Sequence, residues 1–469
     1  MLINGKILKE GEKIIVYSPY SEEKVGEVTK AGKDQVPYII ETAKRGASLM
    51  KKLSWKKRGE MLNKAAENLQ QRKMEFAKLL VKEAGKTITD AVKETERAVN
   101  TLKESAIAAA GIQGCTVPLE NSEDMGRLGY YQRVPVGIVL AITPFNFPLN
   151  LACHKIGPAL AAGNAVILKP ASKTPLSSIL LGQIVIQAGF PPEAISVVCG
   201  DGGEIGNLLA ADPRVRKVSF TGSYETGKNI CMAAGVKKIT MELGSTGAVI
   251  VTPHTDIKKA AAKICKAGFA NGGQVCISVQ RVYVHTSIQE ELITEMKKCA
   301  EQINSGNPML PETELGPMIT KKALKKAMER IEQSLQTGGS CVIGNQNDGN
   351  ILLPTILRDV PESAPVIQEE MFAPVITVNG YNTLSEAISC VNGTNFGLQA
   401  GVFTDRLEEA MVCIDNIECG SVIINDTCNF REDQMPYGGV KCSGIGKEGP
   451  KYAVEEMTEI KMIILNRKV

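Results

Sequence analysis

The spacing of apolar residues changes along the chain, from a helical period to short apolar runs. Between residues 35 and 110, apolar side chains recur at three- and four-residue steps, as in Met61, Ala65 and Leu69. This spacing places them on one face of a helix, so we expect several helices that each bury one side. The alternating stretch at 127–134 predicts a hairpin or an exposed strand pair.

After that stretch, apolar runs of strand length alternate with helical segments. The expected strands are 137–142, 165–168, 195–198, 215–220 and 248–251, with helices at 175–188 and 203–211. Strands that are buried on both faces and alternate with helices are typical of a parallel α/β sheet. The alternation resumes with strands at 279–284, 373–378 and 400–403, helices at 288–303 and 384–391, and a last strand at 461–465. The sequence therefore predicts a second α/β domain.

Length and composition fit a globular protein with more than one core. The chain has 469 residues, which exceeds the size at which a single core stops growing. Lysine and arginine number 54 against 51 acidic residues, a balance that argues against a nucleic-acid-binding surface. The chain has no apolar stretch of membrane-spanning length, and its first twelve residues lack the apolar core of a secretory signal. We therefore expect neither a nucleic acid nor a membrane as partner.

The cysteines and histidines restrict the possible chemistry. Thirteen cysteines are scattered between Cys115 and Cys442 and form no CxxC pair. This pattern indicates reduced thiols in a cytoplasmic protein, not a disulfide framework. The histidines are His154, His254 and His285, too few for a His-rich metal site or a Ser-His-Asp triad. No metal site is expected.

Cys276 has the local sequence of a candidate nucleophile. An expected helix at 257–267 leads into the Gly272-Gly273 break, and Cys276 follows. Glycines allow the backbone to approach a ligand closely, and the nucleophilic thiolate needs a local positive field or a base to form. A buried structural cysteine is the alternative, and the local sequence leaves both open. For the other twelve cysteines the structural role is favoured.

Two polar residues after apolar strands could serve the same chemistry. Glu242 ends an apolar strand, where loss of solvent would raise its pKa and make it a better base near neutral pH. Asn146 lies in a loop stiffened by two prolines, where a fixed amide could stabilise an oxyanion. The alternatives are a solvated or ion-paired carboxylate for Glu242 and an ordinary turn for Asn146.

Other segments suit a phosphate-bearing ligand. A strand enters a glycine-rich helix start at 220–227, and backbone N–H groups at such a start can hold a phosphate. The segment is not the GxGxxG fingerprint, and the glycine turn at 200–203 is a second candidate. Lys169 follows a strand, where it could reach a ligand at the edge of a parallel sheet. A surface lysine is the alternative.

In this order, the segments resemble those of the NAD(P)-dependent aldehyde dehydrogenase superfamily over nearly the whole chain. The resemblance rests on Pro144-Phe-Asn-Phe-Pro148, Leu168-Lys-Pro-Ala-Ser172, Phe220-Thr-Gly-Ser223, Met241-Glu-Leu-Gly244, Gly273-Gln-Val-Cys276, Glu369-Glu-Met-Phe-Ala-Pro374, Asn395-Phe-Gly-Leu398 and the run 436–446. It implies an α/β fold with a Rossmann-type cofactor domain, a related α/β catalytic domain and a β oligomerisation arm. The implied ranges are 1–116 and 136–244 for the cofactor domain, 245–446 for the catalytic domain, and 117–135 with 447–469 for the arm and C-terminal tail.

The resemblance also implies roles for individual residues in the oxidation of an aldehyde to its acid. Cys276 matches the nucleophile that forms a thiohemiacetal and then a thioester, with the oxyanion held by Asn146 and the Cys276 backbone N–H. Glu242 matches the base that activates water. The implied cofactor-binding residues are Thr143, Pro144, Lys169, Ser172, Gly202, Phe220, Gly222, Ser223, Glu370 and Phe372. Because members are dimers or tetramers, a homodimer or homotetramer is expected.

Ser172 favours NADP as the cofactor. Many NAD-preferring relatives carry glutamate three residues after the lysine that matches Lys169, and this carboxylate repels a 2′-phosphate. A serine followed by Lys173 removes the repulsion and leaves Lys169 free to pair with phosphate. We expect NADP to be preferred, with NAD as the alternative.

The substrate predicted from the sequence is a small hydroxylated or anionic aldehyde. Asn150 and His154 match channel positions where relatives that use apolar aldehydes carry large aromatic residues. The segments 273–279 and 397–401 are most similar to the lactaldehyde- and glyceraldehyde-oxidising branch. A purely structural role for His154 is equally open.

Two basic residues, Arg431 and Lys103, could meet an anionic tail of this substrate. Val275 argues the other way, because several relatives that handle phosphorylated or carboxylated aldehydes carry arginine just before the nucleophile. A structural ion pair of Arg431 with Glu432 or Asp433 is the alternative to a substrate role.

Two other functions remain open from the sequence. In a CoA-acylating aldehyde dehydrogenase, CoA takes the acyl group in place of water, and that branch needs no hydrolytic base such as Glu242. A non-catalytic relative kept as a binding or structural protein would normally have lost the nucleophile or the cofactor residues, and all are present here.

Overall fold

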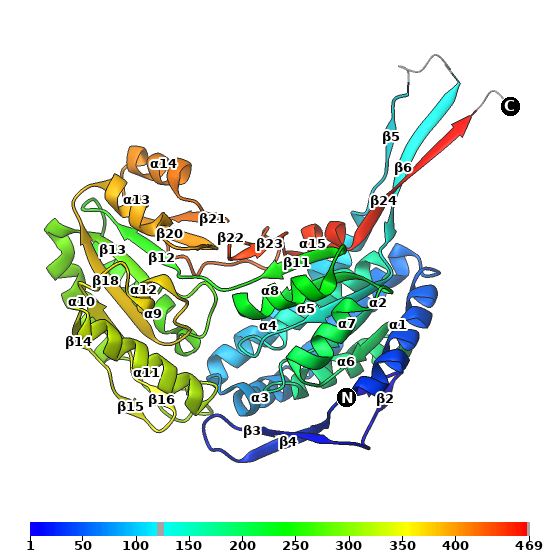
Figure 1. The fold of residues 1–469 in the computed structure, drawn as a ribbon, viewed down its shortest axis with the longest axis horizontal. Helices are drawn as coiled ribbons and strands as arrows, with labels where there is room; N and C mark the ends of the chain where they lie inside the picture. The colour runs from blue at the N-terminus through cyan, green and yellow to red at the C-terminus, as the bar shows by residue number, and fades with distance from the viewer. Residues whose placement is uncertain (120–125, 467–469) are drawn as a thin grey trace.

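The computed structural model describes residues 1–119 and 126–466 of the chain. Two large sheets lie next to each other, each covered by helices, and a slender antiparallel arm projects from the molecule (Figure 1). Residues 120–125 and 467–469, which belong to the predicted arm and tail, lie outside the described residues. Among the helices of the described ranges, none is both long and apolar enough to cross a bilayer.

The first sheet has the strand order β2-β1-β9-β8-β7-β10-β11-β23. Its parallel centre consists of β9 (Ile195–Val197), β8 (Ala165–Lys169), β7 (Ile138–Ile142), β10 (Val215–Thr221) and β11 (Lys238–Glu242). Its antiparallel edges are β1 (Leu2–Ile3), β2 (Lys6–Ile7) and β23 (Gly444–Ile445). Every residue of β7 and β8 is buried, which explains why both are continuous apolar runs.

Helices cover both faces of this sheet. They are α1 (Val36–Met50), α2 (Trp55–Gln71), α3 (Lys73–Ala84), α4 (Ile88–Ala110), α5 (Asn150–Ala162), α6 (Leu176–Gln187), α7 (Asn207–Ala211) and α8 (Tyr224–Ala234). All thirteen residues of α5 are buried, because the helix packs between α4, α15 (Pro450–Glu456) and the sheet. Charged residues on α5 therefore need partners inside the protein.

The second sheet has the order β14-β17-β18-β13-β12-β20-β21. Its strands are β14 (Ser340–Ile343), β17 (Thr355–Arg358), β18 (Val375–Tyr381), β13 (Arg281–His285), β12 (Ala248–Val251), β20 (Gln399–Phe403) and β21 (Ser421–Ile424). All pairs are parallel except β14 with β17. Its helices are α9 (Ile257–Phe269), α10 (Gln289–Glu301), α11 (Lys321–Gln336), α12 (Pro365–Gln368), α13 (Leu384–Asn392) and α14 (Leu407–Asn416).

The arm is built from three segments that are distant along the chain. β6 (Arg127–Pro135) pairs along its full length with β24 (Thr458–Asn466), and its other edge pairs with β5 (Cys115–Val117). The expectation of a hairpin within 127–134 is therefore wrong, because the whole stretch is one strand. An alternating sequence predicts a half-buried strand but does not identify its partner.

Three short antiparallel pairs complete the fold. They are β3 (Lys13–Tyr17) with β4 (Lys24–Thr29), β15 (Asn347–Asp348) with β16 (Ile351–Leu352), and β19 (Phe396–Gly397) with β22 (Val440–Lys441). The predicted parallel α/β architecture is confirmed. The domain boundaries stay predictions, and β23, within the range expected for the catalytic domain, pairs with β11 of the first sheet.

Candidate active site

A pocket of about 480 Å³ lies at the carboxyl ends of β7, β8 and β10 and is closed by segments of the second sheet's half of the chain. Ligands of open α/β sheets bind at such strand ends. The predicted site residues that line it are Thr143, Pro144, Asn146, Lys169, Gly202, Phe220, Gly222, Ser223, Cys276, Glu370 and Phe372. The fold thus brings together side chains that are far apart along the sequence.

A sharp turn after α9 presents Cys276 to this pocket. Asn271, Gly272 and Gly273 adopt positive φ angles of 51°, 64° and 67°, a region that favours glycine. A Cβ atom at Gly273 would lie 2.0 Å from the carbonyl oxygen of Ala373, so no other residue fits there. The backbone therefore requires glycine at position 273, and the positive φ at position 272 also favours it.

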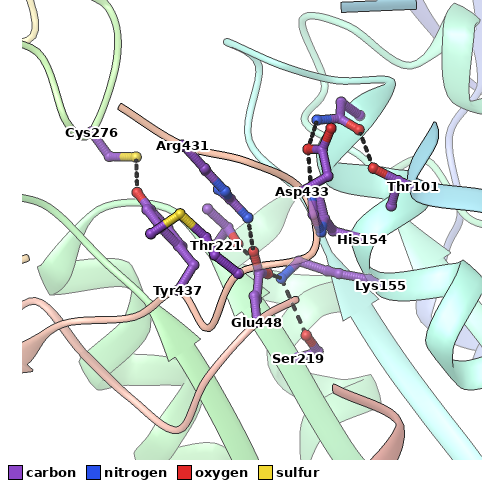
Figure 2. Close-up of polar contacts among 12 residues, drawn as sticks. Thr101, His154, Lys155, Ser219, Thr221, Cys276, Arg431, Asp433, Tyr437 and Glu448 are labelled. Atoms are coloured by element: carbon purple, nitrogen blue, oxygen red, sulfur yellow. Dashed lines mark hydrogen bonds and ion pairs between the residues drawn. The ribbon is translucent and has the colours of Figure 1, made fainter. Parts of the chain in front are cut away.

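The Cys276 thiol is partly exposed and has one close polar neighbour. Its Sγ lies 3.0 Å from the hydroxyl oxygen of Tyr437 (Figure 2). Burial raises the pKa of the thiol to about 11, although the Tyr437 hydrogen bond and the Arg431 charge act to lower it. The thiol is therefore protonated at neutral pH in this state of the protein.

Asn146 is fixed close to Cys276 by hydrogen bonds on both its backbone and its side chain. The Asn146 Nδ2 donates to the carbonyl oxygen of Gln274 at 2.9 Å, and the carbonyl oxygen of Asn146 accepts from Lys86 Nζ at 2.8 Å. Lys86 is in turn held by Glu94, 2.9 Å away, with both side chains buried. Because an amide nitrogen carries two hydrogens, Asn146 keeps a second donor.

Glu242, the last residue of β11, is a buried carboxyl group that has no hydrogen-bond partner among the described residues. Burial and the nearby negative charge of Glu448 raise its pKa well above 4.5. A Cβ atom at Gly438 would lie 2.7 Å from Glu242 Oε1, so this glycine leaves room for the carboxyl group. Glu242 does not line the large pocket, but its charge acts on the Cys276 thiol and raises the pKa of that thiol.

Polar groups line the far part of the pocket. Lys169 ends β8 and is 4% exposed, and burial lowers the pKa of its ammonium group. Ser223 caps the N-terminus of α8 by accepting from the Thr226 N–H. Glu370 accepts from the Ser245 N–H at 3.1 Å, and burial raises the pKa of its carboxyl group to about 7.

Ser172 lies just outside this lining. Its hydroxyl donates to the carbonyl oxygen of Gly200 at 3.1 Å, and the adjacent Lys173 is exposed. Phe372, which has a positive φ of 50°, packs edge-to-face on Phe145 at 5.7 Å between ring centroids.

The sequence did not predict the buried ion-pair network that lies next to Tyr437. Lys155 Nζ donates to Glu448 Oε1 at 2.6 Å and to Ser219 Oγ at 3.1 Å, and Arg431 donates to Glu448 Oε2 at 3.1 Å (Figure 2). Arg431 also stacks on Tyr437, its guanidinium carbon 3.6 Å from the ring centroid. The signal in the sequence is a lysine within a mostly apolar helix. A buried lysine needs a partner for its charge, but the sequence does not identify that partner.

The ion pair anticipated for Arg431 is formed with a different residue. Its partner is Glu448 and not Glu432 or Asp433. Asp433 instead accepts from Arg97 at 2.8 Å and Asn150 at 3.2 Å, and lies 3.0 Å from His154 Nε2.

The four predicted substrate residues do not line the large pocket. Burial lowers the pKa of His154, which is therefore neutral, and Asn150 is bound between Thr101 and Asp433. Arg431 lies beside Tyr437, and Lys103 is exposed on α4. The substrate roles of these residues stay predictions.

Comparison with known proteins gives matches over almost the entire chain. Residues 7–463 match the sequence profile of the Aldehyde dehydrogenase family. The 3-sulfolactaldehyde dehydrogenase of Priestia aryabhattai is 44% identical over 467 residues, 99% of this chain and 98% of that protein. The lactaldehyde dehydrogenase of Methanococcus aeolicus is 37% identical and covers 100% of both chains.

A solved structure agrees equally well. The glyceraldehyde-3-phosphate dehydrogenase GapN of Methanocaldococcus jannaschii, complexed with NADP, has a TM-score of 0.94 and 37% identity, and the match covers 98% of this chain and 100% of that one. The predicted fold class is therefore confirmed over the full length.

Proposed function

Because this chain belongs to the aldehyde dehydrogenase family, we propose that it oxidises a small hydroxylated or anionic aldehyde to the carboxylic acid, with NADP as the preferred cofactor. The observation that carries this proposal is the pocket shared by Cys276 and Asn146, with the unpaired carboxyl group of Glu242 buried nearby. A thiol, an amide donor and a carboxyl base are the three groups that acyl transfer to water through a thioester requires.

The first half of the proposed reaction uses Cys276 and Asn146. The Cys276 thiol loses its proton to solvent, and the thiolate adds to the carbonyl carbon, so that an S–C bond forms and the C=O electron pair moves to oxygen. The free hydrogen of Asn146 Nδ2 donates to this oxyanion, which is worth about 3–4 kcal/mol at comparable sites. Hydride loss from the same carbon then leaves a thioester on Cys276.

The pocket has groups that fit a dinucleotide cofactor. The N-terminus of α8 at Ser223 offers N–H groups to a pyrophosphate, while Lys169 and the Glu370 carboxyl group suit ribose hydroxyls. When bound there, the nicotinamide supplies the hydride acceptor.

The second half of the proposed reaction uses Glu242. A water molecule attacks the acyl carbon, its proton passes to the Glu242 carboxylate, and the C–S bond breaks with its electron pair on sulfur. Because the pKa of Glu242 is raised, its base form grows as the pH rises. A base at this position supports hydrolysis over transfer to CoA.

Charge near the thiol supports an anionic or hydroxylated substrate. Lys155 and Arg431, whose side chains are both buried, share the single carboxylate of Glu448. Arg431 Nε is buried with no hydrogen-bond partner in the part of the chain that the structure describes. A buried cation with a free donor favours an oxyanion on the substrate. The names of the relatives, sulfolactaldehyde and lactaldehyde dehydrogenases, agree with this class.

We also propose that the arm joins copies of the chain into a homodimer or homotetramer in the cytoplasm. The outer face of β24 exposes Ile460 (58%), Met462 (39%) and Ile464 (56%), apolar side chains that an interface would cover. All thirteen cysteines, each within the described residues, are free thiols, as expected in a reducing compartment.

Replacing Cys276 tests the proposed reaction. Cys276→Ala should abolish NADPH formation with lactaldehyde or a sulfonated analogue, and Asn146→Ala should lower kcat by about 100- to 1000-fold. Cys341→Ala, on the exposed strand β14, is the matched control and should keep parental activity. Free acid should appear without added CoA. Oxidation that persists in Cys276→Ala, or that requires CoA, would contradict the proposal.

Cofactor preference is tested at Ser172. Ser172→Glu places a carboxylate near the expected 2′-phosphate, and repulsion of about 1–3 kcal/mol should lower kcat/KM with NADP by about tenfold to a hundredfold. The value with NAD should stay within a few-fold of the parent. Equal losses with both cofactors would show that Ser172 does not discriminate between them.

The oligomerisation proposal is tested on the outer face of β24. The double variant Ile460→Lys with Ile464→Lys should sediment as a monomer, because two buried charges would oppose the contact. Lys461→Gln, at the next position in the alternation, should leave the assembly intact. A parent that sediments as a monomer would refute this proposal.

A further inference from the structure

Tyr437 connects a buried cation to the thiol of Cys276. Its hydroxyl oxygen lies 3.0 Å from Cys276 Sγ, and the guanidinium carbon of Arg431 lies 3.6 Å from its ring centroid (Figure 2). The tyrosine is 1% exposed and packs among Val275, Ile277 and Leu398. No part of the proposed reaction described so far uses this side chain.

The backbone holds Tyr437 in place through the same residue that holds Arg431. The Tyr437 N–H donates to the Glu448 carbonyl oxygen at 3.1 Å, and the Glu448 N–H donates back at 2.7 Å. The Glu448 carboxylate also accepts from Arg431 at 3.1 Å. Tyr437 and Arg431 are thus positioned by the same residue, Glu448.

We propose that Tyr437 is a positioning residue for the nucleophile, whose hydroxyl donates a hydrogen bond to Cys276 Sγ and stabilises the thiolate, with Arg431 strengthening that donor. This inference rests on the proposed role of Cys276. A thiol can donate to or accept from a phenol, but a thiolate can only accept, so ionisation of Cys276 fixes the direction of the bond. A hydrogen bond to a charged group is also stronger than one between neutral groups.

Arg431 strengthens the donor by its place over the ring. A cation on the face of an aromatic ring attracts its electrons, which makes the phenol a better hydrogen-bond donor. The Arg431 charge lowers the pKa of both Tyr437 and Cys276, against the larger effect of burial, which raises both. The other titratable groups that act on the thiol are Glu242 and Glu370, and both raise its pKa.

The same bond serves the release of the product. When water attacks the thioester and the C–S bond breaks, the electron pair goes to Sγ, and the Tyr437 O–H donates to the departing thiolate without giving up its proton. Stabilising a thiolate favours both its formation as nucleophile and its departure as leaving group. Tyr437 therefore acts in both halves of the reaction through Cys276.

The test measures the ionisation of Cys276 without turnover. The full-length protein is treated with iodoacetamide across a pH series, and alkylation of the Cys276 peptide is followed by mass spectrometry, which separates it from the other twelve cysteines. Tyr437→Phe should raise the apparent pKa of Cys276 by about one unit and slow alkylation below that pKa about tenfold. Tyr283→Phe, a buried tyrosine bonded to Glu362 at 2.8 Å, is the matched control and should leave the profile unchanged.

A second substitution moves the profile in the opposite direction. A ring-fluorinated tyrosine at position 437 has the same shape but a more acidic hydroxyl, so the apparent pKa of Cys276 should fall. The fluorinated variant keeps the test valid if Tyr437→Phe fails to fold. Thermal melting and NADP-binding measurements would detect such a failure. The inference would be overturned if the pH profile of Cys276 alkylation stayed the same in both variants. Because alkylation needs no aldehyde, this outcome is distinct from a failure of the proposed reaction.

Discussion

The site depends on the hydrogen bonds and ion pairs that the buried carboxylate of Glu448 accepts. This carboxylate accepts from Lys155 of α5, from Arg431 and, at 3.4 Å, from Thr221 of β10, so it joins the first sheet to the segment that carries Tyr437. Burial alone would raise its pKa, but Lys155 and Arg431 lower it to about 2. Removing one member of such a buried network lowers the free energy of unfolding by about 3–5 kcal/mol, because the remaining charge is left without a partner.

The same network gives two buried carboxyl groups, Glu448 and Glu242, different environments. Glu448 is contacted by two cations, which lower its pKa, whereas Glu242 has no cation within bonding distance in the described structure, and burial and the charge of Glu448 raise its pKa. Carboxyl groups whose pKa values are pushed apart in this way divide structural and acid–base work between them. Glu448 fixes geometry, and Glu242, whose carboxyl oxygens have no hydrogen-bond partner among the described residues, is the group proposed to exchange a proton.

The sequence was sufficient for elements whose signal is local. The strand expected at 248–251 is found at those bounds, because a short run buried on both faces has a clear start and end. Most of the residues that line the pocket were implied by the family resemblance, because the single motifs left structural alternatives open. The family resemblance also placed 127–134 and the terminal strand in one arm, which the pairing of β6 with β24 confirms. By contrast, the partners of Lys155 and Tyr437 were not predictable, because each pair joins residues that are distant along the chain and that local spacing does not connect. Arg431 was recognised as a candidate but paired with the wrong acids for the same reason.

The most direct test of the account is to look for the acyl group on Cys276. In Glu242→Gln the proposed hydrolytic base is lost while the thiol and Asn146 are kept, so the aldehyde and NADP should give one burst of NADPH per subunit. Mass spectrometry of the quenched protein should then find one acyl group, on the Cys276 peptide. Steady oxidation by this variant, or a burst with no adduct on Cys276, would contradict the thioester route.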